Sequence, residues 1–136
     1  MAVSLWVGRE RFEIGAPSFF KAWFSTISVR LEAGNWGSRF PTIMHDLYGG
    51  SVPHQRAETA TKELESIRRE FAELSTDLVV WDFEDREARP PWGDRISDHI
   101  TSLANYFVTS DGRDLFDVVR RALAESTRTS QHAVVT

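Results

Sequence analysis

The centre of the chain carries the feature that most constrains its fold, a long and regular alternation of apolar and charged residues. From Ala57 to Leu74, apolar residues recur at steps of three and four, and mostly polar or charged residues lie between them. Such spacing produces a helix with one apolar face, which is stable when that face is buried against a second layer. The segment therefore predicts an amphipathic helix lying on a sheet, with an apolar stripe made of Ala57, Ala60, Leu64, Ile67, Phe71 and Leu74.

Three further segments have helical patterns. The first spans residues 17–34 and the second spans residues 41–47, and a proline opens each of them. Proline suits the first turn of a helix, because the N–H group that it lacks has no partner there. The third begins near residue 113 and presents apolar residues as far as Leu123. Together with the central segment, these patterns predict three to four helices.

Runs rich in β-branched and aromatic residues occur near both ends of the chain and after the central helix. Residues 2–7 and 11–14 flank a turn that contains Gly8, and this arrangement predicts a hairpin. Residues 97–106 are compatible with a helix or a strand. Three later runs are candidate strands: a buried strand at 78–83, a strand at 107–109, and an edge strand or frayed end at 133–135.

The order of these segments favours an α+β fold. Helices gather in the first half of the chain and do not alternate strictly with strands, as they would in a doubly wound sheet. We expect a small mixed or antiparallel sheet, made from the N-terminal hairpin and two or three later strands, packed against three to four helices. A length of 136 residues suits one domain with one core. We therefore expect a single domain over residues 1–136.

Composition narrows the class of function. The absence of cysteine excludes a disulfide framework, a thiolate zinc site and a thiol nucleophile. The formal net charge of -4 argues against nucleic-acid binding, which needs a basic surface. No apolar run approaches the ~20 residues of a membrane span, and the first residues lack the basic start of a secretory signal. We expect a cytoplasmic protein without a nucleic-acid or membrane partner.

Motifs for catalysis or cofactor binding are missing from the sequence. Ser38 follows Gly37 but lacks the first glycine of a nucleophile elbow, and Gly49-Gly50 lacks the Lys-Ser/Thr that completes a phosphate-binding loop. No pair of histidines has the usual spacing of a zinc site, the four being His45, His54, His99 and His132. We expect a binding protein and not an enzyme, with no cofactor and no metal.

A charged stretch from Asp82 to Asp98 is the first candidate for a binding surface. Its six carboxylates and three arginines give it a formal charge of -3, most of the chain's net charge of -4. Three interpretations are open: a solvated charge run, an acidic loop that contacts a partner protein, and a metal or acid–base site. The stretch lacks the glycine and the distal glutamate of an EF-hand loop. The candidate partner contacts within it are Glu84, Asp85, Glu87 and Asp94.

Trp36 and Trp92 are the second candidates. Both lie in loops rich in glycine and proline, whereas Trp6, Trp23 and Trp81 fall in predicted core elements. A tryptophan in such a loop either closes an edge of the core or anchors a partner. We expect both to close the core, and we also retain Trp92 among the candidate partner contacts.

Several separate motifs occur in order along most of the chain. They are Ser18–Phe20, Phe24–Ser28, Trp36–Pro41, Val79–Asp85, Pro90–Asp94 and Asn105–Phe116. Through these motifs the chain resembles the immunity protein 70 family, from the first hairpin to the last helix. Members of that family are encoded beside bacterial polymorphic or contact-dependent toxins and neutralise the toxin domain by binding it.

The resemblance implies a non-enzymatic inhibitor that acts in the cytoplasm on a cognate toxin C-terminal domain, a nuclease being one candidate activity. It assigns no individual residue to the toxin contact, and a homo-oligomer is compatible with it. Two other hypotheses remain beside it. One is an oligomeric scaffold or regulatory binding module, and the other is a minor hydrolase that uses the carboxylates of residues 82–98.

Overall fold

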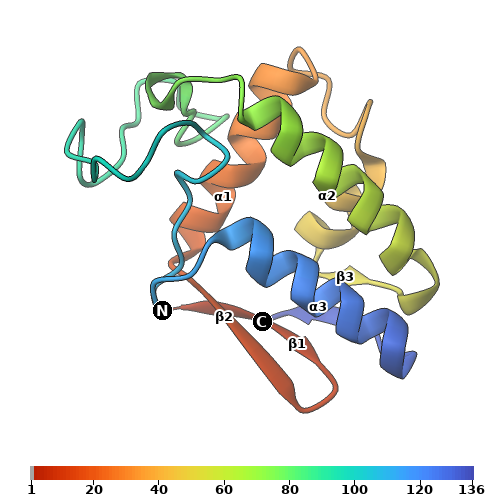
Figure 1. Ribbon diagram of the computed structural model, residues 1–136. Helices are drawn as coiled ribbons and strands as arrows, with labels where there is room; N and C mark the ends of the chain where they lie inside the picture. Colours follow the sequence, from red (N-terminus) through yellow and green to blue (C-terminus); the bar gives the residue numbers. More distant parts are fainter. Residues whose placement is uncertain (1) are drawn as a thin grey trace.

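Both ends of the chain contribute to one four-stranded antiparallel sheet (Figure 1). The structure is a computed structural model that describes residues 2–136. Gly8 adopts a φ of 61° in the two-residue turn between the first two strands, a conformation that glycine reaches without strain. The strand order is β2-β1-β4-β3, where β1 is Val3–Val7, β2 is Glu10–Gly15, β3 is Ser51–Val52 and β4 is Ala133–Val135.

The last strand lies inside the sheet, and this corrects the sequence prediction of an edge strand or a frayed end. On one side β4 pairs with β1, where Val135 lies opposite Leu5. On its other side β4 pairs with β3, where Val134 lies opposite Ser51. Sequence reasoning missed this position because three residues near a chain end carry no signal for two partners that are distant in the sequence.

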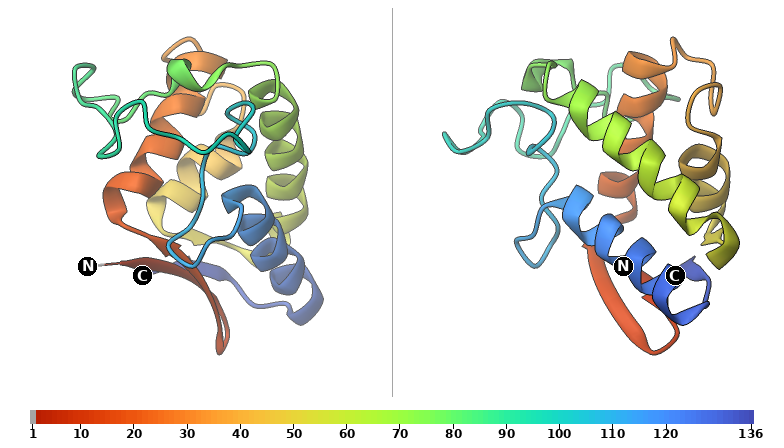
Figure 2. Two further views of the ribbon diagram at one scale, coloured as in Figure 1. Left: turned by 60° about the vertical axis from the view of Figure 1, so that its left-hand side comes forward. Right: turned by 45° about the vertical axis from the view of Figure 1, so that its right-hand side comes forward.

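Helices cover one face of this sheet, as both views of Figure 2 show. The four predicted helical segments are present, and the first ends in a π-helical turn that reaches nearly to the predicted end of the segment. The helical elements are α1 (Pro17–Thr26) with its π-helical continuation (Ile27–Leu31), a π-helical segment (Thr42–Leu47), a 3-10 turn (His54–Arg56) leading into α2 (Ala57–Phe71), and α3 (Leu115–Thr129). The fold is therefore α+β, as the sequence predicts.

Aromatic side chains fill the space between the two layers. Phe71 and Phe116 meet edge to face with ring centroids 5.7 Å apart, and Trp23 meets Phe116 in the same way at 5.5 Å. All three side chains are at most 1% exposed. The predicted stripe of α2 points into this core, since every one of its members up to Phe71 is buried. This packing fixes α1, α2 and α3 relative to one another.

The predicted strand at 78–83 is wrong. The chain forms a 3-10 turn at Thr76–Leu78 and then runs irregularly, because side chains of α1 take up its backbone hydrogen bonds. The run at 107–109 makes one isolated bridge, between Val108 and Asp114, and residues 97–106 contain turns only. A long irregular region thus wraps around the end of the helical layer (Figure 1). Within residues 2–136, none of the helices combines the length and the apolar character that a membrane crossing needs.

Candidate partner-binding surface

Two hydroxyl groups of α1 hold the irregular segment that follows the 3-10 turn. The N–H of Val80 donates a hydrogen bond to Thr26 Oγ1 at 3.0 Å, and the N–H of Phe83 donates to Ser25 Oγ at 3.0 Å. Both hydroxyl residues are fully buried. A strand would need these backbone N–H groups for its ladder, so the hydroxyls of α1 replace a neighbouring strand.

Charged side chains of the same helical segment hold the two ends of this attachment. Arg30 Nε donates to the carbonyl of Leu78 at 2.8 Å, and Lys21 Nζ lies 2.6 Å from Glu84 and 3.3 Å from Asp82. The hydrogen bond with Glu84 raises the pKa of Lys21. The pKa of Asp82 is lowered, mainly because its carboxylate accepts the backbone N–H of Glu84, and then by Lys21. These pairs are at least partly open to solvent, so they orient the loop and add little to stability.

The loop beyond Phe83 presents its acidic side chains to solvent. Asp85 and Glu87 lie on one turn, in which the carboxylate of Asp85 accepts the backbone N–H of Glu87 at 3.1 Å. Across residues 2–136, no basic side chain forms an ion pair with either of them, whereas the charge of Glu84 is offset by Lys21. All five predicted contact residues are exposed, namely Glu84, Asp85, Glu87, Trp92 and Asp94.

Trp92 rests on two aromatic neighbours and leaves part of its ring in solvent. Its ring meets Trp81 edge to face at 5.3 Å, and its indole N–H donates to the hydroxyl of Tyr106 at 2.9 Å. Burial raises the pKa of that hydroxyl, and the nearby charge of Asp94 adds to the shift. With 37% of its surface exposed, Trp92 is one of three large hydrophobic residues that lie open among residues 2–136. Trp92 and Asp94 therefore both lie near Tyr106, and Trp92 is held there by its contacts with Tyr106 and Trp81.

Trp36 occupies a different environment. It is half-buried against the core, its indole N–H donates to the carbonyl of Met44 at 2.8 Å, and its ring lies 4.7 Å from that of Phe83. Tyr48, which is 43% exposed, covers the ring from another side at 4.8 Å. Trp36 thus joins the acidic loop to the core and is less available to a partner than Trp92.

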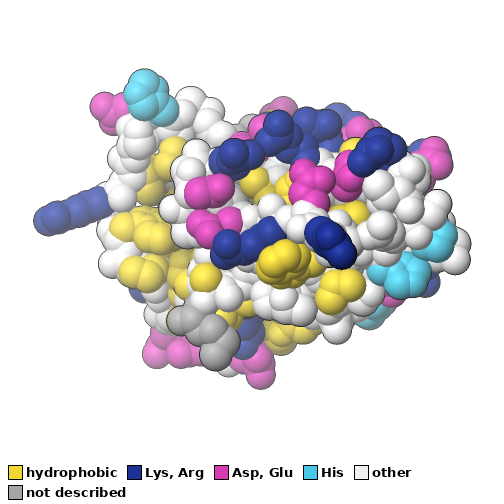
Figure 3. All heavy atoms as spheres, turned by 90° about the horizontal axis from the view of Figure 1, so that it is seen from below, with side chains coloured by type: hydrophobic (Ala, Val, Ile, Leu, Met, Phe, Trp, Pro, Cys, Tyr) yellow, Lys and Arg dark blue, Asp and Glu magenta, His cyan; other side chains and the backbone are white. Residues whose placement is uncertain are grey.

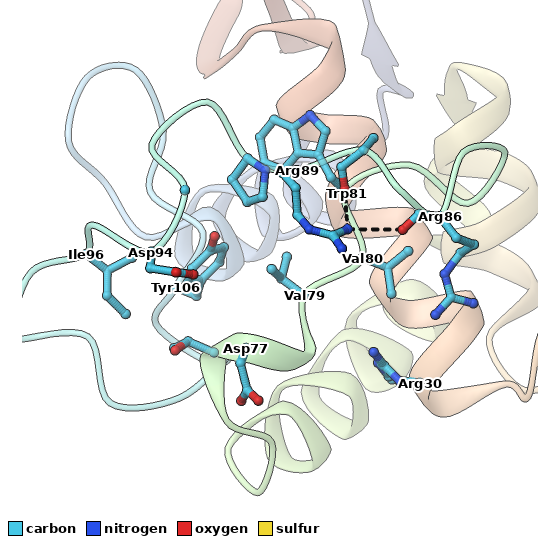
Figure 4. Close-up of a pocket in the computed structure, with 14 residues that line it drawn as sticks. Arg30, Asp77, Val79, Val80, Trp81, Arg86, Arg89, Asp94, Ile96 and Tyr106 are labelled. Carbon is cyan, nitrogen blue, oxygen red and sulfur yellow. Dashed lines mark hydrogen bonds between the residues drawn. The ribbon is translucent and has the colours of Figure 1, made fainter.

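A pocket of about 720 Å³ opens between the loop, Arg30 and residues 76–81 (Figure 4). Arg30 and Arg86 lie on one side of it, Asp94 and Tyr106 lie on the other, and Val79 lies between them. The guanidinium of a further arginine in the pocket, Arg89, donates to the backbone carbonyls of Arg86 and Ala88. The pocket thus combines charges of both signs with the apolar side chains of Val79 and Val80. Sequence reasoning missed Arg30 and Tyr106, because neither lies in the charged stretch and no spacing pattern connects them to it.

Sequence reasoning also missed a buried carboxylate that shapes one of the motifs. Glu32 is 3% exposed, and its carboxylate accepts the backbone N–H groups of Gly37, Arg39 and Phe40 at 2.9 to 3.1 Å. Gly37 has a φ of 78°, and an added Cβ there would lie 2.1 Å from the ring of His45. The motif Trp36–Pro41 is therefore architectural in this structure.

The surface combines charged and aromatic side chains. Its carboxylates are exposed to water except that of Asp82, which is half-buried, and Asp82 and Glu84 share the ammonium group of Lys21. Across residues 2–136, the histidines and carboxylates nowhere gather in a group of three or more that would hold a metal ion. The loop carries exposed negative charges and an exposed tryptophan.

Comparison with known proteins identifies the family. The family model described as Immunity protein 70 matches residues 5–135. No curated protein and no solved structure matches the chain. The family match includes the hairpin, the helical layer, the irregular loop and the last strand, which is nearly the whole fold. The chain therefore belongs to the immunity protein 70 family.

Proposed function

We propose that this protein protects its cell by binding a cognate toxin domain in the cytoplasm and blocking it by direct contact. Membership of an immunity protein family supports an immunity function and implies a toxin partner. The toxin contact in this proposal is the surface formed by residues 81–94. The observation that carries it is that one loop presents both the unpaired carboxylates of Asp85 and Glu87 and the exposed ring of Trp92.

The chemistry of this surface indicates what kind of toxin face it fits. Tryptophan is enriched among the residues that dominate binding energy, and a flanking set of carboxylates favours a basic partner. A toxin that cleaves nucleic acid has a basic cleft, and a locally acidic inhibitor would cover that cleft. The start of the loop is attached to α1, because the backbone N–H groups of Val80 and Phe83 donate to hydroxyls of that helix, and this attachment reduces the conformational entropy that this part of the chain loses on binding.

Co-expression with the toxin domain encoded beside this chain tests the proposed activity. Cells that produce the toxin domain alone should stop growing, and cells that also produce this protein should grow. The two proteins should then elute together from a sizing column. Continued growth arrest together with separate elution would refute the proposal.

A pair of tryptophan substitutions tests the location of the contact. Trp92→Ala should weaken the complex tenfold or more, because loss of a central tryptophan costs about 2 kcal/mol or more of binding energy. Trp6→Ala is the matched control, since Trp6 is half-buried in β1 and lies opposite Arg11 of the sheet, away from the loop. It should leave affinity unchanged. Equal losses from both variants, with both folded, would place the contact elsewhere.

A further inference from the structure

The sheet has one outer strand with an edge that is open over part of its length, at residues 11–13 of β2. β2 and β3 are its outer strands, but β3 has two residues whereas β2 has six. Both views of Figure 2 show the hairpin of β1 and β2 at the lower border of the molecule. A free edge presents backbone N–H and C=O groups that pair readily with another strand. The edge of β2 can therefore accept a further strand where its backbone groups are free.

The register of the hairpin shows which backbone groups are free. Ser4 exchanges backbone hydrogen bonds with Thr136 beside β4, at 2.9 and 3.0 Å, so the backbone groups of Ser4 point away from β2. Glu13 lies opposite Ser4 and Arg11 lies opposite Trp6, the next residue of the same parity. These are non-hydrogen-bonded pairs of the antiparallel ladder, in which each residue directs its N–H and C=O groups away from the residue that it faces. Arg11 and Glu13 consequently direct theirs to the free edge.

Charges of both signs line a groove of about 730 Å³ between this edge and α3. On the sheet side Arg11 pairs with Glu13 at 3.1 Å, and on the helix side Arg128 pairs with Glu125. Figure 3, which views the molecule from the sheet side, shows acidic and basic side chains next to each other on this face. An anionic or a cationic segment would meet repulsion in such a groove as well as attraction. A surface that also carries both signs of charge could avoid this repulsion, because each of its charges can face one of opposite sign.

We propose that the edge of β2 binds a second copy of this chain, with the two β2 strands antiparallel about a two-fold axis at Phe12. In this register Arg11 of one copy lies opposite Glu13 of the other, and the same pair repeats across the axis. Both residues direct their backbone groups outward, so each pair exchanges two N–H···O bonds. Their side chains lie on one face with opposite charges, the arrangement that stabilises cross-strand pairs.

Other registers are worse. Centring the axis on Arg11 would place two arginines opposite each other, and like charges in that position are destabilising. The ladder is confined to residues 11–13, because the N–H of Ser110 already occupies the carbonyl of Ile14. Charged residues on an edge often prevent pairing, but here the signs of Arg11 and Glu13 are opposite, so the edge is complementary to a second copy of itself. The surface at 81–94 stays open in this dimer.

Charge reversal gives a test that only this register passes. The wild-type protein should sediment as a concentration-dependent dimer, whereas Arg11→Glu and Glu13→Arg should each be monomeric, because each places like charges across the axis. An equimolar mixture of the two variants should form a heterodimer, since an all-acidic edge then faces an all-basic one. The double variant R11E/E13R should dimerise like the wild type.

Circular dichroism and thermal melting control for folding, because Arg11 also contacts Ser4 and Glu13 also contacts Ser110. Lys62→Glu, a reversal on the exposed side of α2 and outside the groove, controls for non-specific charge effects and should retain the dimer. A wild-type protein that is monomeric at its highest soluble concentration overturns the proposal. A mixture of folded single variants that fails to associate also overturns it.

Discussion

Glu32 shows how much one buried charge contributes to the shape of this protein. It is the only charged side chain that is buried among residues 2–136, and a charge in that position is tolerable only when hydrogen bonds satisfy it. Three backbone N–H groups do so, and they belong to the turn that presents Trp36 to the core. The motif around Trp36 therefore depends on a residue outside it.

Glu32→Gln should destabilise the fold by about 3 kcal/mol, because the amide replaces one acceptor oxygen with a donor and strands buried N–H groups. Urea unfolding followed by tryptophan fluorescence would measure the change. Glu65→Gln, on the exposed side of α2, is the control and should shift stability by less than about 0.5 kcal/mol. Equal midpoints for the two variants would contradict this role of Glu32.

Asp114 gives a prediction about pH. It caps the N-terminus of α3 by accepting the N–H of Phe116, and burial raises its pKa above the ordinary value. The folded state thus binds the proton of Asp114 more tightly than the unfolded state does. The stability that this proton contributes is therefore present at low pH and is lost as the pH rises through the raised pKa. The substitution Asp114→Asn would keep the cap without the charge.

At each pH, the quantity to compare is the melting temperature of Asp114→Asn minus that of the wild type. This difference should be more positive at about pH 7 than at about pH 3, two values that lie above and below the titration of Asp114. Thermal scans of both proteins at the two values provide the comparison. A difference that stays constant with pH, or that shrinks as the pH rises, would show that burial does not dominate this group.

At the scale of elements, periodicity predicted the helices well and the strands partly. Apolar spacing sets the helix at residues 57–71, and a glycine turn between β-rich runs sets the hairpin. The same logic failed at 78–83, where an apolar run became irregular chain, because its hydrogen-bond partners are side chains of α1, 54 and 58 positions away. The sequence alone shows that the loop is acidic. It does not show which distant residues contact the loop in the folded chain, namely Arg30, Tyr106 and Lys21.

Thr26 is the element-scale test of that explanation. Thr26→Val keeps the shape of the side chain but strands the buried N–H of Val80, and it should cost about 1–3 kcal/mol. Thr26→Ser keeps the hydroxyl and should cost less. Hydrogen exchange should report faster opening of residues 79–83 in the valine variant than in the serine variant. Matching exchange in the two variants would mean that packing, and not the hydroxyl, holds this segment.

At the scale of the whole molecule, charge is distributed unevenly. The loop at 82–98 carries a formal charge of -3 out of -4, while the groove beside β2 contains both signs. A concentrated charge raises the rate of encounter with an oppositely charged partner, and a balanced surface suits self-association. The two proposed interfaces therefore differ in salt dependence as well as in position, and the toxin complex should be the more sensitive of the two.

The double variant Asp85→Lys and Glu87→Lys tests this difference, because these two carboxylates are exposed and neither forms an ion pair with a described residue. Reversing them should slow association with the toxin domain and flatten its dependence on salt, since screening acts on the attraction that steers the encounter. Stopped-flow mixing at several salt concentrations measures both quantities. Glu58→Lys with Glu65→Lys changes the net charge equally from the exposed side of α2, and should leave most of the rate and its salt slope intact. If both double variants behave alike, the net charge of the molecule drives the encounter, and the loop is not the surface that meets the toxin.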